Sequence, residues 1–467
     1  HPHPPPHATH PPPPPETPDP HLARTPHPPT PTHPRSRAGP CGACSVHVRD
    51  LHGDRIRYRA VTSCLMPIGQ LRGKHLVTIE GLNRDVVSPV QQAIIDEGAS
   101  QCGFCTPGIV VSLTGYLIDG QRPVELEGVK AALGGHLCRC TGYRSLKACT
   151  RYLADVFTGN EDIESLISKG LLPAYFGKMS SRLRALSHTR PQDGSQPAEF
   201  YIAGGTDVYV QTDGVFPSER VTILDGLPEM EGIVATDDAV DVGALTTFEE
   251  FGNHSAILDI IPDIRDYMFL VASLQIRNRA TLGGNIVNAS PIGDMTILLL
   301  ALGSVLVLRS GSKTRSVPMD RFYLGYKQLE KSPDEVLTRI RIPRPAPETR
   351  IGWEKVSKRK CLDIASVNSA LRIRLDGDTI EDAVLAVGGV APVPLLMSAT
   401  GNFLRGRPVG SETVLGAAAL AQEELSPISD VRGSATYKRL LVRQQILAHF
   451  DRLYPEHLDL EEMYEPR

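Results

Sequence analysis

The chain has 467 residues, with 41% hydrophobic and 22% charged side chains and a formal net charge of −4 at pH 7. Such values are typical of globular proteins, and the length predicts about three domains. The near balance of 49 basic and 53 acidic residues argues against a nucleic acid or an anionic membrane as partner. No apolar run reaches the ~18 residues of a membrane-spanning helix, and no signal peptide is recognisable. We therefore expect a cytoplasmic protein that binds no membrane.

Residues 1–37 form a Pro/His-rich tract that we predict to be disordered. Residues 1–40 hold 17 of the 39 prolines and 7 of the 15 histidines, and too few large apolar side chains to offset the entropy of ordering. A metal-binding tail is one interpretation. We favour a misplaced start or a misread frame, because the chain changes character abruptly at Cys41.

The rest of the chain divides by its hydrophobic pattern. Paired strands are predicted up to residue 80, helices over 81–158, a polar linker over 159–195, and mixed strands and helices from 196 onward. The expected strands are Ser45–Val48, Ile56–Thr62, Leu76–Ile79, Phe200–Ile202, Val221–Leu224, Val240–Val242, Ser304–Leu308, Ala365–Leu375 and Ile380–Val387. The expected helices are Ser88–Glu97, Pro107–Asp119, Val124–Leu133, Tyr143–Phe157, a buried one from Met295, Glu412–Glu424 and Thr436–Leu453.

Four cysteines form the strongest chemical signal. Cys102 and Cys105 make a C-x-x-C pair, and Cys138 and Cys140 make a C-x-C pair beyond a helical hairpin. Clustered cysteines in a cytosolic protein are more often metal ligands than disulfides, and four thiolates suit a [2Fe–2S] cluster. Four thiolates also suit zinc, so a zinc-binding scaffold without redox activity is the alternative. C-x-C is unusual for a zinc ribbon, which favours the cluster.

The residues flanking these cysteines add a resemblance. The strings QCGFCTPG (101–108) and LCRCTGYR (137–144) resemble the helical [2Fe–2S] domain of molybdenum hydroxylases, the family of xanthine dehydrogenase and aldehyde oxidase. His136 stands where that family usually has Asn. The resemblance implies a preceding plant-type ferredoxin domain with four cysteine ligands. Cys41, Cys44 and Cys64 match the last three, but Ser36 occupies the first position. We therefore expect the first cluster to be absent or unstable.

Two glycine pairs suggest a flavin. One follows the strand Phe200–Ile202, and the second follows residues 275–278. Paired glycines let backbone amides approach a diphosphate, although one pair alone could be an ordinary turn. Together the two resemble the FAD domain of the same family, of the vanillyl-alcohol-oxidase (PCMH) type rather than a Rossmann fold.

The resemblance implies specific FAD contacts. The diphosphate contacts would be Ala203, Gly204, Gly205, Thr206 and Asp207. The second side would be formed by Thr281, Gly283, Gly284, Asn285, Asn288 and Asp294, with Asp294 toward the ribose or adenine. Leu337 would offer a backbone contact. Lys355 would lie near the isoalloxazine, unless it is a solvated surface lysine.

The predicted fold is a multidomain α+β chain. It contains a truncated β-grasp ferredoxin-like piece (38–80), a four-helix [2Fe–2S] domain (81–158), an α/β FAD domain (196–345) and an α+β C-terminal domain (350–455) resembling a CO dehydrogenase flavoprotein. Such a fusion resembles the small subunit of bacterial xanthine dehydrogenases. No catalytic nucleophile or base is expected here, because the implied chemistry is electron relay.

That resemblance implies an oxidoreductase subunit of purine catabolism. Electrons would pass from a molybdopterin centre, held only by a large partner subunit, through [2Fe–2S] and FAD to NAD. A hetero-oligomer, such as α2β2, would follow. The same role in an aldehyde, nicotinate or CO dehydrogenase type of enzyme stays open, because the partner selects the substrate.

Overall fold

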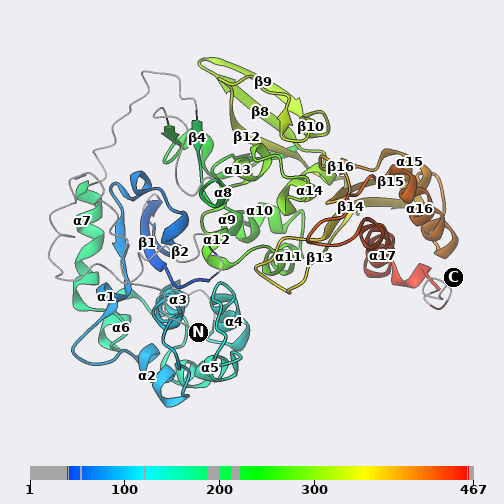
Figure 1. Cartoon of the computed structure of the whole chain (residues 1–467). Coiled ribbons are helices and arrows are strands. Elements are labelled where there is room, and N and C mark those ends of the chain that lie inside the picture. Colours follow the sequence, from blue (N-terminus) through cyan, green and yellow to red (C-terminus); the bar gives the residue numbers. More distant parts are fainter. Residues whose placement is uncertain are drawn as a thin grey trace, which may run out of the picture.

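The computed structural model describes residue 39 and residues 41–52, 55–119, 123–186, 200–211, 221–459 and 461. The predictions for the Pro/His-rich tract, including Ser36, lie outside the described residues. Figure 1 shows the N-terminal units (blue to cyan) and the C-terminal unit (orange to red) on opposite sides of a central unit (green).

The first unit is a three-stranded antiparallel sheet, here called the ferredoxin-like sheet. Strand β1 (Ser45–His52) lies between β2 (Arg55–Thr62) and β3 (His75–Val77). Two short 3₁₀ helices, η2 (Ser63–Leu65) and η3 (Ile68–Leu71), connect β2 to β3. The three predicted strands are confirmed, but the third is shorter because the helix α1 (Ile79–Leu82) begins directly after it.

The helical unit confirms the four predicted helices. They are α2 (Pro89–Asp96), α3 (Thr106–Asp119), α4 (Leu126–Leu133) and α5 (Arg144–Val156). Ser88 starts α2 with a reciprocal capping box to Gln91, which satisfies two otherwise unpaired amides. The shorter α6 (Ile163–Ser168), η4 (Ala174–Lys178) and α7 (Met179–Leu186) follow.

The central unit contains a five-stranded antiparallel sheet and a small parallel pair. The pair is β4 (Phe200–Ile202) with β5 (Val221–Ile223), and α8 (Val208–Gln211) follows β4. The sheet order is β6 (Ile233–Ala235), β7 (Ala239–Gly243), β12 (Val336–Pro343), β8 (Val305–Ser310) and β9 (Lys313–Pro318). A hairpin of β10 (Tyr323–Gly325) and β11 (Gln328–Leu329) extends from it.

Short helices cover this unit and supply its binding loops. They are α9 (Phe248–Asn253), α10 (Ser255–Leu258), α11 (Ile264–Leu270), α12 (Leu274–Arg277) and α13 (Leu282–Val287). The predicted buried helix is α14 (Asp294–Ala301), where every residue after Asp294 is buried. The expected strand, β8, follows it.

The C-terminal unit is a four-stranded antiparallel sheet covered by helices. Its strands are β13 (Arg350–Val356), β14 (Val367–Asp376), β15 (Thr379–Gly388) and β16 (Leu395–Leu396). Its helices are α15 (Ser398–Leu404), α16 (Ser411–Glu424) and α17 (Ala435–Leu453). Because α14 packs on β14 and β15, the central and C-terminal units share a core. Within the described ranges, no helix combines the length and the apolar character needed to cross a bilayer.

Candidate electron-transfer site

The four cysteines of the helical unit come together from two turns. Cys102 and Cys105 lie just before α3, and Cys138 and Cys140 lie just before α5. Each thiol has its neighbour in the other motif: Cys102 lies within hydrogen-bond reach of Cys140, and Cys105 of Cys138. Two pairs of thiols suit a [2Fe–2S] cluster, in which each iron takes two protein ligands.

The turns around these cysteines favour thiolates. A hydrogen bond from the Phe104 backbone amide lowers the pKa of Cys102. Burial opposes ionisation of Cys138, but hydrogen bonds from Thr141 outweigh it and lower the Cys138 pKa; the two side chains are 3.0 Å apart. Burial raises the pKa of Cys105 to about 12. A bound iron would overcome this, because a coordinated thiol is deprotonated.

A single-metal site is less well supported. Among the described residues, no three His, Cys, Asp or Glu side chains converge closely enough to hold one metal ion. A structural zinc would need four ligands converging on one point, whereas the hydrogen-bonded neighbours here are Cys102 with Cys140 and Cys105 with Cys138. The donor set therefore fits a binuclear cluster better than zinc.

The three cysteines of the ferredoxin-like unit also lie near one another. The Cys44 carbonyl accepts a hydrogen bond from the Ser63 amide at 3.1 Å, which brings Cys64 to Cys44. A hydrogen bond from Cys64 lowers the pKa of Cys44 to about 6, and Cys41 lies close enough to oppose ionisation of Cys64. These three donors are together, while the position expected for the fourth lies outside the described residues.

The two segments that carry the first-site cysteines, one with Cys41 and Cys44 and the other with Cys64, contact both neighbours in the expected relay. On one side the Leu137 amide, next to Cys138, donates to the Cys41 carbonyl at 3.2 Å. On the other side the Leu65 carbonyl, next to Cys64, lies against Gly205, where an added Cβ would be 3.2 Å from it. The first-site cysteines therefore lie between the four-cysteine site and the first glycine loop.

The two glycine loops of the central unit lie side by side. A side chain at Gly204 would bring its Cβ to 2.1 Å from the Arg279 carbonyl oxygen, so only glycine fits there. Gly205 has φ +75°, which glycine adopts without strain. A Cβ at Gly284 would lie 3.9 Å from the Ala203 side chain. The predicted diphosphate loops thus form one cradle, and they fit a dinucleotide such as FAD.

Several residues of the second loop also hold the loop in shape. Thr281 Oγ1 accepts from the Gly284 amide at 3.1 Å and caps α13. The Gly283 amide donates to the Ala244 carbonyl at 2.9 Å. Asn285 Oδ1 accepts from the Thr296 amide and hydroxyl at 3.1 and 2.9 Å. The side chains of Thr281 and Asn285 therefore fix the cradle's second wall, and their FAD contacts stay predictions.

A lysine that the sequence did not indicate joins the cradle. Lys327 Nζ, from the β10–β11 turn, donates to Asn288 Oδ1 at 3.0 Å. Burial raises the pKa of Asp207, while the Lys327 charge and a hydrogen bond from Asn288 oppose this. The structure thus brings together one acidic residue of the first loop, one amide of the second and a cation. No local motif marks Lys327, which is 39 residues from Asn288.

Asp294, at the start of α14, and Lys355, on β13, form an ion pair between the central and C-terminal units. Lys355 Nζ lies 2.7 Å from Asp294 Oδ2, and the Lys355 side chain is only 1% exposed. The alternative of a solvated surface lysine is therefore wrong. Lys355 also donates to the Leu270 carbonyl at 3.1 Å, and Asn368 donates to Asp294 at 2.7 Å. Because the two side chains are in direct contact, Asp294 at the ribose or adenine and Lys355 at the isoalloxazine are not compatible with each other as predicted positions.

Leu337 lies buried on β12, and its backbone contact with FAD stays a prediction. Its side chain is 3% exposed on β12, within the core of the central unit. Strand β12 pairs with β8 through Leu337 and Leu308, and a bulge follows. Only the Leu337 backbone could therefore reach a cofactor.

The segment before the second glycine loop connects three units. Gln275 Nε2 donates to Ser112 Oγ at 2.9 Å and to the Ala132 carbonyl at 3.0 Å, both in the helical unit. Asn278 Nδ2 donates to the Ala60 carbonyl of β2 at 2.9 Å. These bonds join the central unit to both iron–sulfur units, so the segment has an interdomain role as well as preceding the loop.

Comparison with known families identifies three domains. Residues 78–151 match the [2Fe-2S] binding domain, residues 183–345 the FAD binding domain in molybdopterin dehydrogenase, and residues 354–452 the CO dehydrogenase flavoprotein C-terminal domain. Cys41, Cys44 and Cys64 precede the first of these matches.

Whole-chain relatives agree. The xanthine dehydrogenase of Emericella nidulans is 29% identical over 89% of this chain, and that of Oryza sativa subsp. japonica is 27% identical over 79%. A nicotinate hydroxylase of Emericella nidulans is 28% identical over 80%. The chain spans about a third of the length of these curated relatives, covering 35%, 33% and 36% of them.

Solved structures give the same fold. CO dehydrogenase from Oligotropha carboxidovorans matches 55% of this chain and 90% of its own at a TM-score of 0.52 and 28% identity. Quinoline 2-oxidoreductase from Pseudomonas putida 86 matches 57% and 90% at a TM-score of 0.50 and 27% identity. The multidomain α+β fold is confirmed. The chain thus has a [2Fe–2S] domain and an FAD-binding domain of the kind found in molybdenum hydroxylases.

Proposed function

We propose that the chain is the electron-transfer subunit of a xanthine dehydrogenase. Electrons from a molybdenum centre in a partner subunit would pass through [2Fe–2S] to FAD and then to NAD, in the cytoplasm. The observation that carries this proposal is the continuity of the loops: Leu137 bonds to Cys41, and Leu65 lies on Gly205. Bound FAD would supply the step between one-electron clusters and two-electron hydride transfer.

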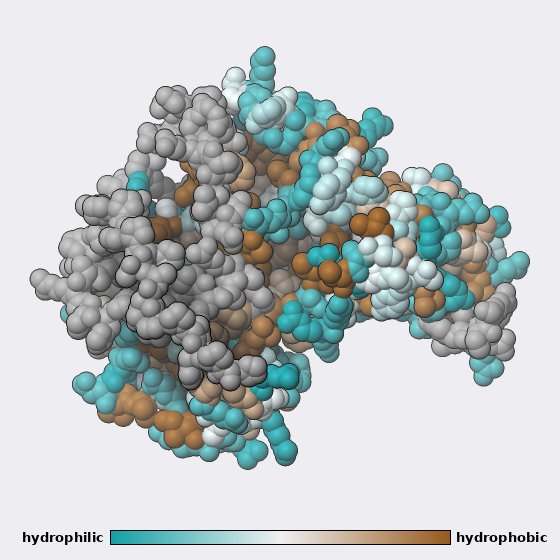
Figure 2. Space-filling view, in the orientation of Figure 1, coloured by the Kyte–Doolittle hydropathy of each residue, from teal (hydrophilic) through white to brown (hydrophobic). Residues whose placement is uncertain are grey.

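The surface around the four-cysteine site supports a docking role. Phe104 and Leu137 flank the cysteines and are 50% and 44% exposed, and Cys102 and Cys140 are themselves exposed. Figure 2 shows a further brown area over α2 in the same unit, where Ile95 is exposed. Apolar side chains around a redox centre suit a partner that excludes water from it. We propose that the large molybdopterin-binding subunit covers this face.

The metal content tests the cofactors. The full chain, reconstituted without oxygen with iron, sulfide and FAD, should show overlapping flavin and iron–sulfur absorption. We expect iron and acid-labile sulfide near two per chain, because the first site has three matched cysteines. Four of each would refute the incomplete first site. A colourless, zinc-containing protein would refute the electron-transfer proposal and support the scaffold alternative.

Turnover tests the relay. If the first cluster is missing, NADH-to-dye activity through FAD should survive while purine-to-NAD turnover of the assembled enzyme falls sharply. Normal purine-to-NAD turnover would contradict the interrupted relay.

The relatives favour one second candidate, a nicotinate hydroxylase type of enzyme, because such a protein matches 80% of the chain at 28% identity. The partner that copurifies decides between them. Bleaching of the iron–sulfur absorption by nicotinate but not by xanthine in the purified complex would select the second candidate, because this readout does not require electrons to reach FAD.

A further inference from the structure

Two side chains, the buried Gln70 and the partly buried Arg279, hydrogen-bond to backbone carbonyls of the first glycine loop. Gln70 Nε2, from η3 of the ferredoxin-like unit, donates to the Ala203 carbonyl at 2.7 Å. Arg279 Nη2 donates to the Gly204 carbonyl at 2.7 Å and also to Gln70 Oε1. Gln70 is only 4% exposed. Two successive carbonyls of the loop are therefore fixed by one connected pair of side chains, here called the Gln70–Arg279 clamp.

The clamp determines where the loop's amides point. In a trans peptide the N–H and the C=O of one unit point in opposite directions. Fixing the carbonyls of Ala203 and Gly204 on one side therefore directs the amides of Gly204 and Gly205 to the other. Within the described part of the chain, neither amide has a hydrogen-bond acceptor in the protein. Two adjacent amides directed outward form an anion-binding concavity.

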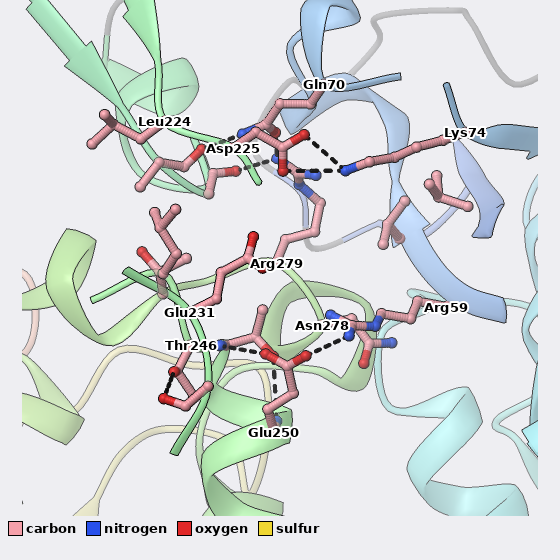
Figure 3. A pocket seen from close by; sticks show the side chains of 18 residues that line it. Arg59, Gln70, Lys74, Leu224, Asp225, Glu231, Thr246, Glu250, Asn278 and Arg279 are labelled. Atoms are coloured by element: carbon pink, nitrogen blue, oxygen red, sulfur yellow. Dashed lines mark hydrogen bonds and ion pairs between the residues drawn. The ribbon is translucent and has the colours of Figure 1, made fainter. Parts of the chain in front are cut away.

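The clamp side of the loop faces a polar cavity between the ferredoxin-like sheet and the central unit. Figure 3 shows Gln70, Lys74 and Asp225 in its upper part, Arg279 in the middle and Glu250 in its lower part. The acidic and basic groups there pair with each other: Lys74 lies 3.0 Å from Asp225, and Arg59 bonds to Glu250. Because these charges satisfy one another, the cavity itself is not built for a charged ligand, and the binding side is the opposite face of the loop.

We propose that Gln70 and Arg279 are positioning residues for the diphosphate of FAD, so that the ferredoxin-like unit helps to build the flavin site. The inference rests on the proposed function in one respect: the loop Ala203–Asp207 must hold the FAD diphosphate. It adds a residue from a different domain to that site. By linkage, bound FAD should also tighten the contact between the two units.

The test removes the clamp's link to the first carbonyl. In the full chain, Gln70→Leu keeps the side-chain volume and leaves the Ala203 carbonyl without its donor. Flavin is first removed from the protein. Binding of added FAD is then followed by flavin fluorescence, and ADP is tested as a competitor. We expect FAD and ADP to bind about tenfold more weakly, the size typical for losing a buried hydrogen-bond partner. Riboflavin, which has no diphosphate, should bind within about twofold of the original chain, since the clamp acts on the diphosphate alone.

The matched control is Asn278→Leu. It removes an interdomain hydrogen bond from the same cavity, to the Ala60 carbonyl, but leaves both loop carbonyls held. It should bind FAD as the original chain does. Equal losses in Gln70→Leu and Asn278→Leu, or an equal loss for FAD and riboflavin, would overturn the proposal, since general loosening of the interface would explain them.

A second variant covers the case in which Gln70→Leu does not fold. Gln70→Glu keeps an acceptor for Arg279 and replaces the donor to the Ala203 carbonyl by a carboxylate oxygen. The affinity for FAD should therefore fall, while the affinity for riboflavin should stay within about twofold of that of the original chain. Unchanged FAD affinity in this variant would overturn the clamp. If the original chain binds neither FAD nor ADP, the proposed function itself is wrong, and the two failures are thereby distinguished.

Discussion

Replacing Lys355 with methionine tests how much the buried ion pair stabilises the central and C-terminal units. The change removes the cation that lies 2.7 Å from Asp294 Oδ2 and also removes the donor to the Leu270 carbonyl. Removing one partner of a buried pair typically costs about 3–5 kcal/mol. Asp294 is 15% exposed and keeps Asn368, so we expect the lower end, about 3 kcal/mol of unfolding free energy.

The chain offers its own probe for this measurement. Its single tryptophan, Trp353, is 2% exposed and lies two residues before Lys355 on β13. Urea unfolding followed by its fluorescence therefore reports on the same strand. Lys313→Met, on the exposed strand β9, is the control and should change stability by less than about 0.5 kcal/mol.

The double variant Lys355→Met with Asp294→Asn separates lost attraction from the cost of an unpaired charge. It should recover about 1–2 kcal/mol relative to the single variant, because no buried carboxylate is left unpaired. A loss below about 1 kcal/mol for Lys355→Met, or a double variant less stable than the single one, would refute the reasoning.

Three further predictions follow from the loops, a buried histidine and the docking face. Gly204→Ala should weaken FAD binding at least tenfold in a fluorescence titration, because its Cβ would meet the Arg279 carbonyl at 2.1 Å; Gly410→Ala, where the nearest atom is 3.9 Å away, should not. Burial lowers the pKa of His449 to about 3, so the unfolded chain gains a proton below pH 6.5 that the folded chain refuses. Folding stability should therefore fall by up to about 1.4 kcal/mol per pH unit below pH 6.5 on account of His449. His449→Gln should reduce that slope in urea unfolding from pH 7 to 5 and leave the pH dependence above pH 7 unchanged; an identical slope would contradict the claim. Phe104→Asp should abolish copurification with the large subunit while iron absorbance is retained, and Val234→Asp, equally exposed at 54% on β6, should copurify normally.

The strongly patterned elements were predictable because their conformation depends on local sequence. The buried helix α14 and the strand β8 follow from one apolar run that is too long for a single strand, and α3 follows from Pro107 at its first turn. The short helices α9 to α13 were not predicted. They contain four to seven residues each, too few for a helical period, and several are fixed by caps such as Thr247 and Ser273.

The candidate site divides in the same way. The cysteine and glycine motifs are visible in sequence because their spacing is local. Gln70 and Lys327 were not visible, because their partners lie 133 and 39 residues away and neither belongs to a motif. Their roles depend on how separate units pack, which no single segment of the chain records. Lys355 shows the converse: its sequence allowed a surface location, and only packing reveals its burial.

The bonds made by Gln275 and Asn278 limit how this chain can be recombined with its relatives. In sequence, the region between residues 158 and 200 is a natural crossover point for exchanging a flavin module. A chimera made there would separate Gln275 from its acceptors at Ser112 and Ala132, and Asn278 from its acceptor at Ala60. The unit of exchange is therefore the module together with its docking residues, and a library built on matched acceptors should yield more folded chimeras than one built on domain boundaries alone.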